Sequence, residues 1–109
     1  MSTITRDELH ATLTDLVVLD ALPAGYYEQE HLPGALNLVA DDVAERAAAL
    51  IPNRDAAVVT YCSNTSCRNS EQVAGALRNL GYTNVRVYRE GIQDWVGAGL
   101  PTESLTVRA

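Results

Sequence analysis

Two cysteines and an arginine stand close together in the middle of the chain. Five positions separate Cys62 from Arg68, and the second cysteine, Cys67, comes just before the arginine. The residues between the cysteines are small and polar: Ser63, Asn64, Thr65 and Ser66. A small-residue loop can turn several backbone N–H groups toward one point and form a cavity for an anion. A thiol there has a lowered pKa and attacks as the thiolate. We therefore interpret Cys62 as a catalytic nucleophile and residues 63–68, including Cys67 and Arg68, as a substrate-binding loop.

Two interpretations of Cys67 remain open. Its thiol could resolve a persulfide or sulfenate on Cys62 by forming a disulfide, provided that the loop bends enough to bring the sulfur atoms together. It could equally be a small residue at the entry to a helix. A zinc site is not expected, because His10 and His31 lie far from the cysteines and show no paired ligand spacing. We interpret His31, which precedes a Pro-Gly turn, as structural.

The elements that position the loop can be predicted from apolar runs alternating with helical patterns. Strands are expected at 16–19, 35–39, 56–59 and 84–88. Helices are expected from a Thr5–Glu8 capping box, over 42–50 with Asp41 as the cap, and over 70–80 and 91–98. Strands joined by helices form a parallel sheet covered on both faces, an α/β fold. Ligands bind beyond the carboxyl ends of such strands, so Asp20 is expected to support the loop from a neighbouring strand.

Three segments in the same order as the motifs of a known family make the chain resemble a single rhodanese-like domain from about Leu16 to Pro101. They are Val18-Leu19-Asp20 with His31-Leu32-Pro33-Gly34-Ala35, then Val58-Val59-Thr60-Tyr61-Cys62, then Gly81-Tyr82 with Glu90-Gly91 and Trp95. The resemblance implies a five-stranded parallel sheet with helices on both faces. It also implies sulfur transfer: Cys62 carries a persulfide from thiosulfate or another persulfide donor to a thiol or thioredoxin-like acceptor. No metal or organic cofactor is implied.

Departures from the family pattern leave other functions open. The arginine common after the first aspartate is absent, because Ala21 and Leu22 follow Asp20. The Cys-x5-Arg loop is longer than in typical sulfurtransferases and is similar to that of phosphatases that activate cyclin-dependent kinases and of related arsenate reductases. One alternative is therefore an oxyanion enzyme that uses Cys62 and Arg68. Another is a redox-sensing or binding module without turnover.

Composition limits the remaining possibilities. The 109 residues carry a formal net charge of -6, and all eight cations are arginines. This length predicts a single domain over residues 1–109, with a tail at 102–109 that frays. The acidic balance argues against nucleic acid or an anionic membrane as a partner. Apolar runs are too short for a membrane span and no signal peptide is recognisable, so a cytoplasmic location is expected.

Overall fold

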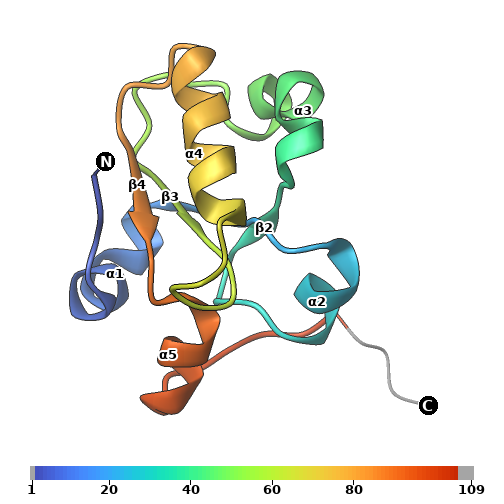
Figure 1. Ribbon diagram of the computed structural model, residues 1–109. Helices are drawn as coiled ribbons and strands as arrows, with labels where there is room; N and C mark the ends of the chain where they lie inside the picture. Colours follow the sequence, from blue (N-terminus) through green and yellow to red (C-terminus); the bar gives the residue numbers. More distant parts are fainter. Residues whose placement is uncertain (1, 106–109) are drawn as a thin grey trace.

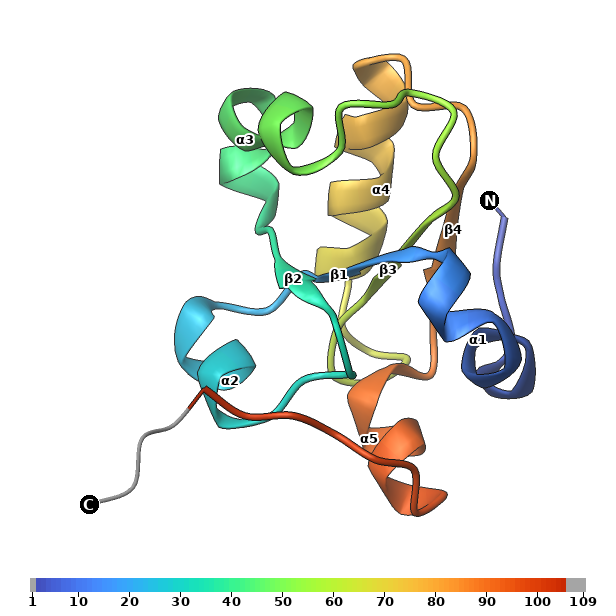
Figure 2. The ribbon, with the colours of Figure 1, turned by 180° about the vertical axis from the view of Figure 1, so that it is seen from behind.

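The computed structural model describes residues 2–105 and contains one parallel sheet. Its four strands lie in the order β2-β1-β3-β4 (Figures 1 and 2). Their bounds are β1 Val17–Asp20, β2 Leu36–Asn37, β3 Val58–Tyr61 and β4 Val85–Tyr88. The register pairs Asp20 with Tyr61 and Tyr61 with Tyr88. The carboxyl ends of β1, β3 and β4 therefore stop at the same edge of the sheet, directly before Cys62. The prediction of an α/β fold with a parallel sheet is confirmed.

The fifth strand implied by the family resemblance is reduced to a single bridge in the described part of the chain. Thr3 pairs in parallel with Val87. The Ile4 amide donates to the Val87 carbonyl at 3.1 Å, and the Val87 amide donates to the Ser2 carbonyl at 3.0 Å. Because the first helix begins at Arg6, this segment is too short to extend into a ladder. It nevertheless occupies the edge position beside β4.

In the described part of the chain, one α-helix precedes the strands and four more connect or follow them. They are α1 Arg6–Thr12, α2 Ala24–Gln29, α3 Val43–Leu50, α4 Asn69–Asn79 and α5 Gly91–Gly97. The predicted capping box starts α1, with the Glu8 amide donating to Thr5 Oγ1 at 3.1 Å. The predicted Asp41 cap is wrong. Asp41 lies in a 3-10 turn over 40–42, and α3 begins at Val43 without a side-chain cap. No helix in residues 2–105 is long and apolar enough to cross a membrane.

The helices cover both faces of the sheet (Figures 1 and 2). One core cluster joins the sheet to α3 and α4 and includes Val43, Leu77 and Cys62. The other cluster joins the opposite face to α1 and α5 and includes Leu9 and Trp95. Alternate strand residues point to opposite faces, which is why the continuous apolar runs of β1 and β3 supply both clusters. The loop after β3 thus starts from a strand fixed on both sides.

The segment after Pro101, expected to fray, is paired as far as the structure describes it. Trp95 Nε1 donates to the Pro101 carbonyl at 2.8 Å and directs the chain back toward α2 (Figure 2). Glu103 and His31 then exchange two backbone hydrogen bonds, and the Leu105 amide donates to the Glu28 carbonyl. Residues 106–109, the rest of the predicted tail, lie outside the described residues.

Candidate active site

Cys62 follows the last residue of β3 and is buried against the first turn of α4. Its side chain is 1% exposed. Cys62 Sγ lies 3.5 Å from Ser70 Oγ and 3.4 Å from the Cys67 carbonyl oxygen. Ser70 is itself buried, and its backbone carbonyl accepts a hydrogen bond from Thr60 Oγ1 of β3 at 2.9 Å. Ser70 Oγ and the first turn of α4 thus face the Cys62 sulfur.

The loop brings the two cysteines together. Cys62 and Cys67 form a disulfide, with their Cα atoms 6.3 Å apart. Asn64 makes the bend, because its carbonyl accepts from the Cys67 amide at 3.1 Å and its Oδ1 accepts from the Ser66 amide at 2.9 Å. Since α4 begins only at Asn69, Cys67 belongs to the loop and not to the first turn of the helix. Its sulfur is within bonding reach of the predicted nucleophile.

This bend differs from the expected anion cavity in one respect. The loop amides were expected to turn toward one point and face a bound anion. The Ser66 and Cys67 amides instead donate to Asn64. The Asn64 side chain also donates to Gln93 Oε1 at 3.2 Å and connects the loop to α5. Ser63 and Asn64 are partly buried, whereas Thr65 and Ser66 are exposed at the outer turn.

The start of α5 holds the loop from the other side. The Ile92 amide donates to the Cys62 carbonyl at 2.9 Å, and the Gln93 amide donates to the Ser63 carbonyl at 3.0 Å. These contacts are possible because Gly91 has no side chain. A Cβ on Gly91 would lie 2.5 Å from the Ser63 carbonyl carbon and 2.6 Å from the Cys62 oxygen, and its φ is +73°. Glycine is required here both by the close approach and by the left-handed backbone.

Arg68 lies at the rim of the site and not inside it. Its side chain is 74% exposed, and its Nη1 lies 3.2 Å from Glu71 Oε1. The other Glu71 oxygen lies 3.6 Å from Nη1 of Arg89, the residue after β4. Glu71 therefore holds two arginines near the carboxyl edge of the sheet. Glu71 and Arg89 were not predicted as site residues, because this contact joins α4 to a strand end far along the chain.

Asp20 supports the site indirectly, through the side chain of Tyr61. The Tyr61 hydroxyl donates to Asp20 Oδ2 at 2.9 Å and accepts from the Leu32 amide at 3.0 Å. The Leu22 amide donates to Asp20 Oδ1 at 2.8 Å. Burial raises the pKa of the Asp20 carboxyl, and burial together with the Asp20 charge raises the pKa of Tyr61. The hydroxyl therefore stays protonated and fixes the residue immediately before Cys62.

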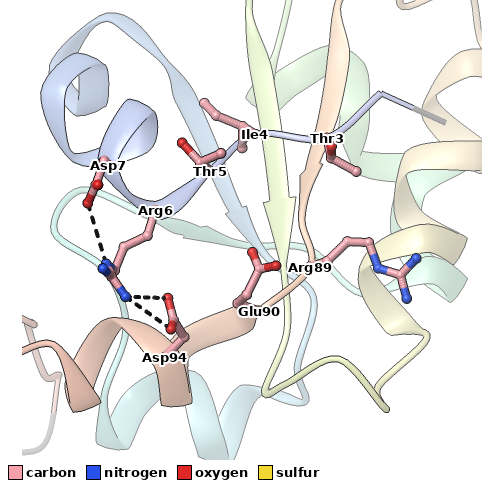
Figure 3. Close-up of a pocket in the computed structure, with 8 residues that line it drawn as sticks. All are labelled: Thr3, Ile4, Thr5, Arg6, Asp7, Arg89, Glu90 and Asp94. Carbon is pink, nitrogen blue, oxygen red and sulfur yellow. Dashed lines mark hydrogen bonds and ion pairs between the residues drawn. The ribbon is translucent and has the colours of Figure 1, made fainter.

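Two hollows lie near this edge of the sheet, and neither is lined by Cys62. One, of about 330 Å³, lies between the N-terminal segment and the start of α5 (Figure 3). Its arginine Arg6 is paired with Asp94 at 3.1 Å, and Arg89 points away from that pair. The other, of about 560 Å³, is lined by residues following β1 and β2 and by Asn69 and Gln72 of α4.

Comparisons with known proteins agree with this geometry. The family model of the rhodanese-like domain matches residues 5–98. The chain belongs to the rhodanese-like domain family. A solved rhodanese-like relative, the "rhodanese with anions" of Escherichia coli, superposes with a TM-score of 0.68 at 30% identity, covering 82% of this chain and 98% of that one.

Curated relatives of this rhodanese-like domain carry different names. An HTH-type transcriptional regulator of Mycobacterium tuberculosis is 31% identical over 92% of this chain and 44% of its own length. Thiosulfate sulfurtransferase PspE of Escherichia coli is 39% identical over 54% of this chain and 55% of its own. The chain thus spans about half the length of these two relatives. The family itself includes sulfurtransferases.

The predicted site residues fall into three groups in this rhodanese-like domain. Cys62, Cys67 and the residues between them form one compact loop, Arg68 turns outward to Glu71, and Asp20 acts one residue upstream through Tyr61. Ser70, Gln93 and Gly91 were missed. Gly91 and Gln93 both lie in the closing-motif segment Glu90-Gly91-Ile92-Gln93-Asp94-Trp95, but neither was assigned to the site. In residues 2–105 no group of three or more His, Cys, Asp or Glu side chains is placed to hold a metal ion.

Proposed function

We propose that this rhodanese-like domain is a sulfurtransferase that moves sulfane sulfur from thiosulfate or a persulfide donor to a thiophilic acceptor through Cys62. One observation carries the proposal: Cys62 stands at the carboxyl end of β3, beside Ser70 Oγ and the first turn of α4. That position suits a nucleophile that must be a thiolate and then hold a negatively charged persulfide. The similarity to a thiosulfate sulfurtransferase supports the same chemistry.

The proposed cycle consists of two displacements at sulfur. The Cys62 thiolate attacks the sulfane sulfur of thiosulfate, the sulfur–sulfur bond of thiosulfate breaks, and sulfite leaves with the electron pair. An acceptor nucleophile then attacks the outer sulfur of the Cys62 persulfide and releases the Cys62 thiolate. Cyanide would leave as thiocyanate, and a thiol would leave as a persulfide. Every bond made or broken joins sulfur to sulfur or sulfur to carbon, so this chemistry calls for no metal or organic cofactor.

Arg68 would act in this cycle as the charge that attracts an anionic donor to the loop. Its exposed guanidinium is held by Glu71 close to Cys67, where a doubly charged donor would approach. Since Cys62 must be reduced to attack, we place the domain in a reducing compartment such as the cytoplasm. A thiol or thioredoxin-like protein is the proposed acceptor there.

A second candidate function is a redox-sensing module without turnover. The Cys62–Cys67 disulfide favours it, because a loop that closes this bond records oxidation without needing a substrate. The relative named as a transcriptional regulator is compatible with such a role. The oxyanion enzyme has less support, since two loop amides bind Asn64 and Arg68 is paired with Glu71.

Steady-state kinetics separate these functions. Reduced protein given thiosulfate and cyanide should form thiocyanate with parallel double-reciprocal plots, which are the sign of a ping-pong cycle. Cys62→Ser should lower the rate at least about 1,000-fold, because a hydroxyl cannot carry the sulfur. Its matched control is Ser63→Cys in the Cys62→Ser background, which moves the thiol by one residue. Thiocyanate formation by fully reduced Cys62→Ser at the wild-type rate would contradict the proposal.

A further inference from the structure

The second cysteine of the loop gives this domain an acceptor of its own. We propose that the Cys67 thiolate discharges the Cys62 persulfide by attacking Cys62 Sγ, so that the outer sulfur leaves as hydrosulfide. The product is the Cys62–Cys67 disulfide. This inference rests on the proposed function, because a sulfur must first be loaded on Cys62. It adds an activity: reductive release of sulfide from the donor.

The geometry selects the sulfur that is attacked. A persulfide has two electrophilic sulfur atoms, and attack on the outer one would transfer it to Cys67 without making a disulfide. Cys67 Sγ instead reaches Cys62 Sγ, the inner atom, and the Cα separation of 6.3 Å lies in the ordinary range for a disulfide. The backbone of the loop therefore already has the shape needed for the Cys62–Cys67 disulfide, which is the product when the inner sulfur is attacked.

The bend that permits this attack is built into the loop. Asn64 accepts from the amides of Ser66 and Cys67, and the amides of Ile92 and Gln93 hold the Cys62 and Ser63 carbonyls. Both ends of the six-residue segment are thus fixed by hydrogen bonds that do not involve the sulfur atoms. Holding a nucleophile against its target in this way raises the rate of an intramolecular step far above that of a dilute external thiol.

The step balances in atoms and electrons. The Cys67 thiol passes its proton to the outer sulfur of the persulfide, and Cys67 Sγ donates an electron pair to Cys62 Sγ. The bond from Cys62 Sγ to the outer sulfur then breaks, and that sulfur leaves with the pair as HS⁻. The sulfane sulfur is reduced and the two cysteines are oxidised. With thiosulfate as the donor, one turnover yields sulfite, hydrosulfide and an oxidised loop.

A dithiol reductant of the thioredoxin class must then reopen the loop. Cys62 is 1% exposed, whereas Cys67 is partly exposed beside the exposed residues Ser66 and Arg68. An external thiolate therefore reaches Cys67 Sγ first, forms a mixed disulfide there and releases the Cys62 thiolate. The buried cysteine is returned in its reactive form, ready for the next donor.

The test follows the sulfur in reduced protein mixed with thiosulfate, without cyanide or other thiols. Wild type should release a single equivalent of hydrosulfide per chain and then stop. Neither cysteine should then react with an alkylating agent, because both are in the disulfide. Adding thioredoxin with its reductase and NADPH should restore turnover. Cys67→Ser should keep the added sulfur on Cys62, release less than about a tenth of the wild-type hydrosulfide, and yield more thiocyanate when cyanide is added. Cys67→Ala, checked for folding by circular dichroism, should behave in the same way.

The outcomes separate the two proposals. If wild type holds its added sulfur as stably as Cys67→Ser, and cyanide removes it from both as thiocyanate, the internal release is wrong and sulfur transfer stands. If neither protein gains a sulfur although Cys62 is alkylated readily, the proposed function is wrong and the inference falls with it. Hydrosulfide release by Cys67→Ser at the wild-type rate would also overturn the inference.

Discussion

Asp20 contributes to the candidate site through the side chain of Tyr61, and its own carboxyl group is buried. It accepts from the Tyr61 hydroxyl and the Leu22 amide, and it is fully buried. Tyr61 precedes Cys62, so this pair fixes the end of β3 from which the loop departs. Two hydrogen bonds compensate in part for the lost hydration, yet desolvation is the largest influence and raises the pKa of the carboxyl.

This burial predicts a pH dependence of stability. The folded protein holds the Asp20 proton more tightly than the unfolded chain, so protonation stabilises folding. The contribution is complete below the ordinary pKa of 3.8 and is lost as the pH rises through the raised pKa. The side chain in Asp20→Asn cannot ionise, so the free energy of unfolding of this variant does not show this fall with rising pH. In urea unfolding from about pH 4 to about pH 8, the free energy of unfolding of wild type should fall relative to that of the variant.

The variant also loses the acceptor of the Tyr61 hydroxyl, which adds an offset at every pH. The informative quantity is therefore the slope of the difference and not its size. A difference that stays constant over the whole range would show that Asp20 titrates alike in the folded and unfolded chains.

At the scale of elements, α5 acts as a clamp on the loop of residues 62–68. Its first residue, Gly91, lies against the backbone of Cys62 and Ser63, and its next two amides donate to their carbonyls. The helix N-terminus is thereby used to hold protein carbonyls. The helix end that faces Cys62 Sγ is therefore the first turn of α4, which contains Ser70.

Gly91→Ala tests this clamp. The added Cβ clashes with backbone and requires a left-handed conformation, so we expect a loss of about 2–4 kcal/mol in the free energy of unfolding. The displaced loop should also lower thiocyanate formation at least about tenfold. Gly97→Ala in the same helix is the matched control, because its Cβ would meet nothing within 4 Å. Equal behaviour of the two variants would contradict the clamp.

Elements with a buried apolar pattern could be predicted, and elements without one could not. The four strand regions were found from short continuous or alternating apolar runs, and the helix over 70–80 was found because its apolar residues repeat with the helical period. Helix α2 was missed because none of its residues is buried, so it carries no apolar stripe. The pairing of Glu103 with His31 was missed for a similar reason: its two hydrogen bonds are made by backbone groups, which any sequence possesses.

The candidate site consists of residues that are close together in the sequence and of supporting residues that are far from them. Cys62, Cys67 and Arg68 are neighbours in the chain, so their residue types alone suggested a reactive loop. Their supports come from elsewhere: Gly91 and Gln93 from α5, and Asp20 from β1. Such contacts depend on the register of the sheet, which a single sequence does not specify residue by residue. The family resemblance correctly supplied the fold but implied a fifth strand that is only a bridge.

At the scale of the whole molecule, the sheet separates two cores that share the same strands. Leu77 lies fully buried in the cluster under α3 and α4, and Trp95 lies fully buried in the cluster on the other face. The chain has one tryptophan, so its fluorescence reports on the second cluster alone. Because β1 and β3 contribute side chains to both clusters, we expect residues 2–105 to unfold as one cooperative unit.

Leu77→Ala tests this coupling from the face opposite the probe. Truncating a fully buried leucine should lower the free energy of unfolding by about 2–5 kcal/mol. The urea midpoint should shift equally by Trp95 fluorescence and by far-ultraviolet circular dichroism. Leu105→Ala is the matched control, since Leu105 is 60% exposed and its loss should change stability by less than about 0.5 kcal/mol. Separate midpoints for the two probes would show that the two faces unfold independently.

The most direct test of the account is to locate the transferred sulfur. Fully reduced Cys67→Ser is mixed with thiosulfate, freed of excess donor and measured as the intact protein and as peptides by mass spectrometry. We expect one added sulfur atom, located on Cys62 and removed by cyanide as thiocyanate. An unchanged mass, in protein whose Cys62 is readily alkylated, would contradict the claim that Cys62 carries sulfur from thiosulfate.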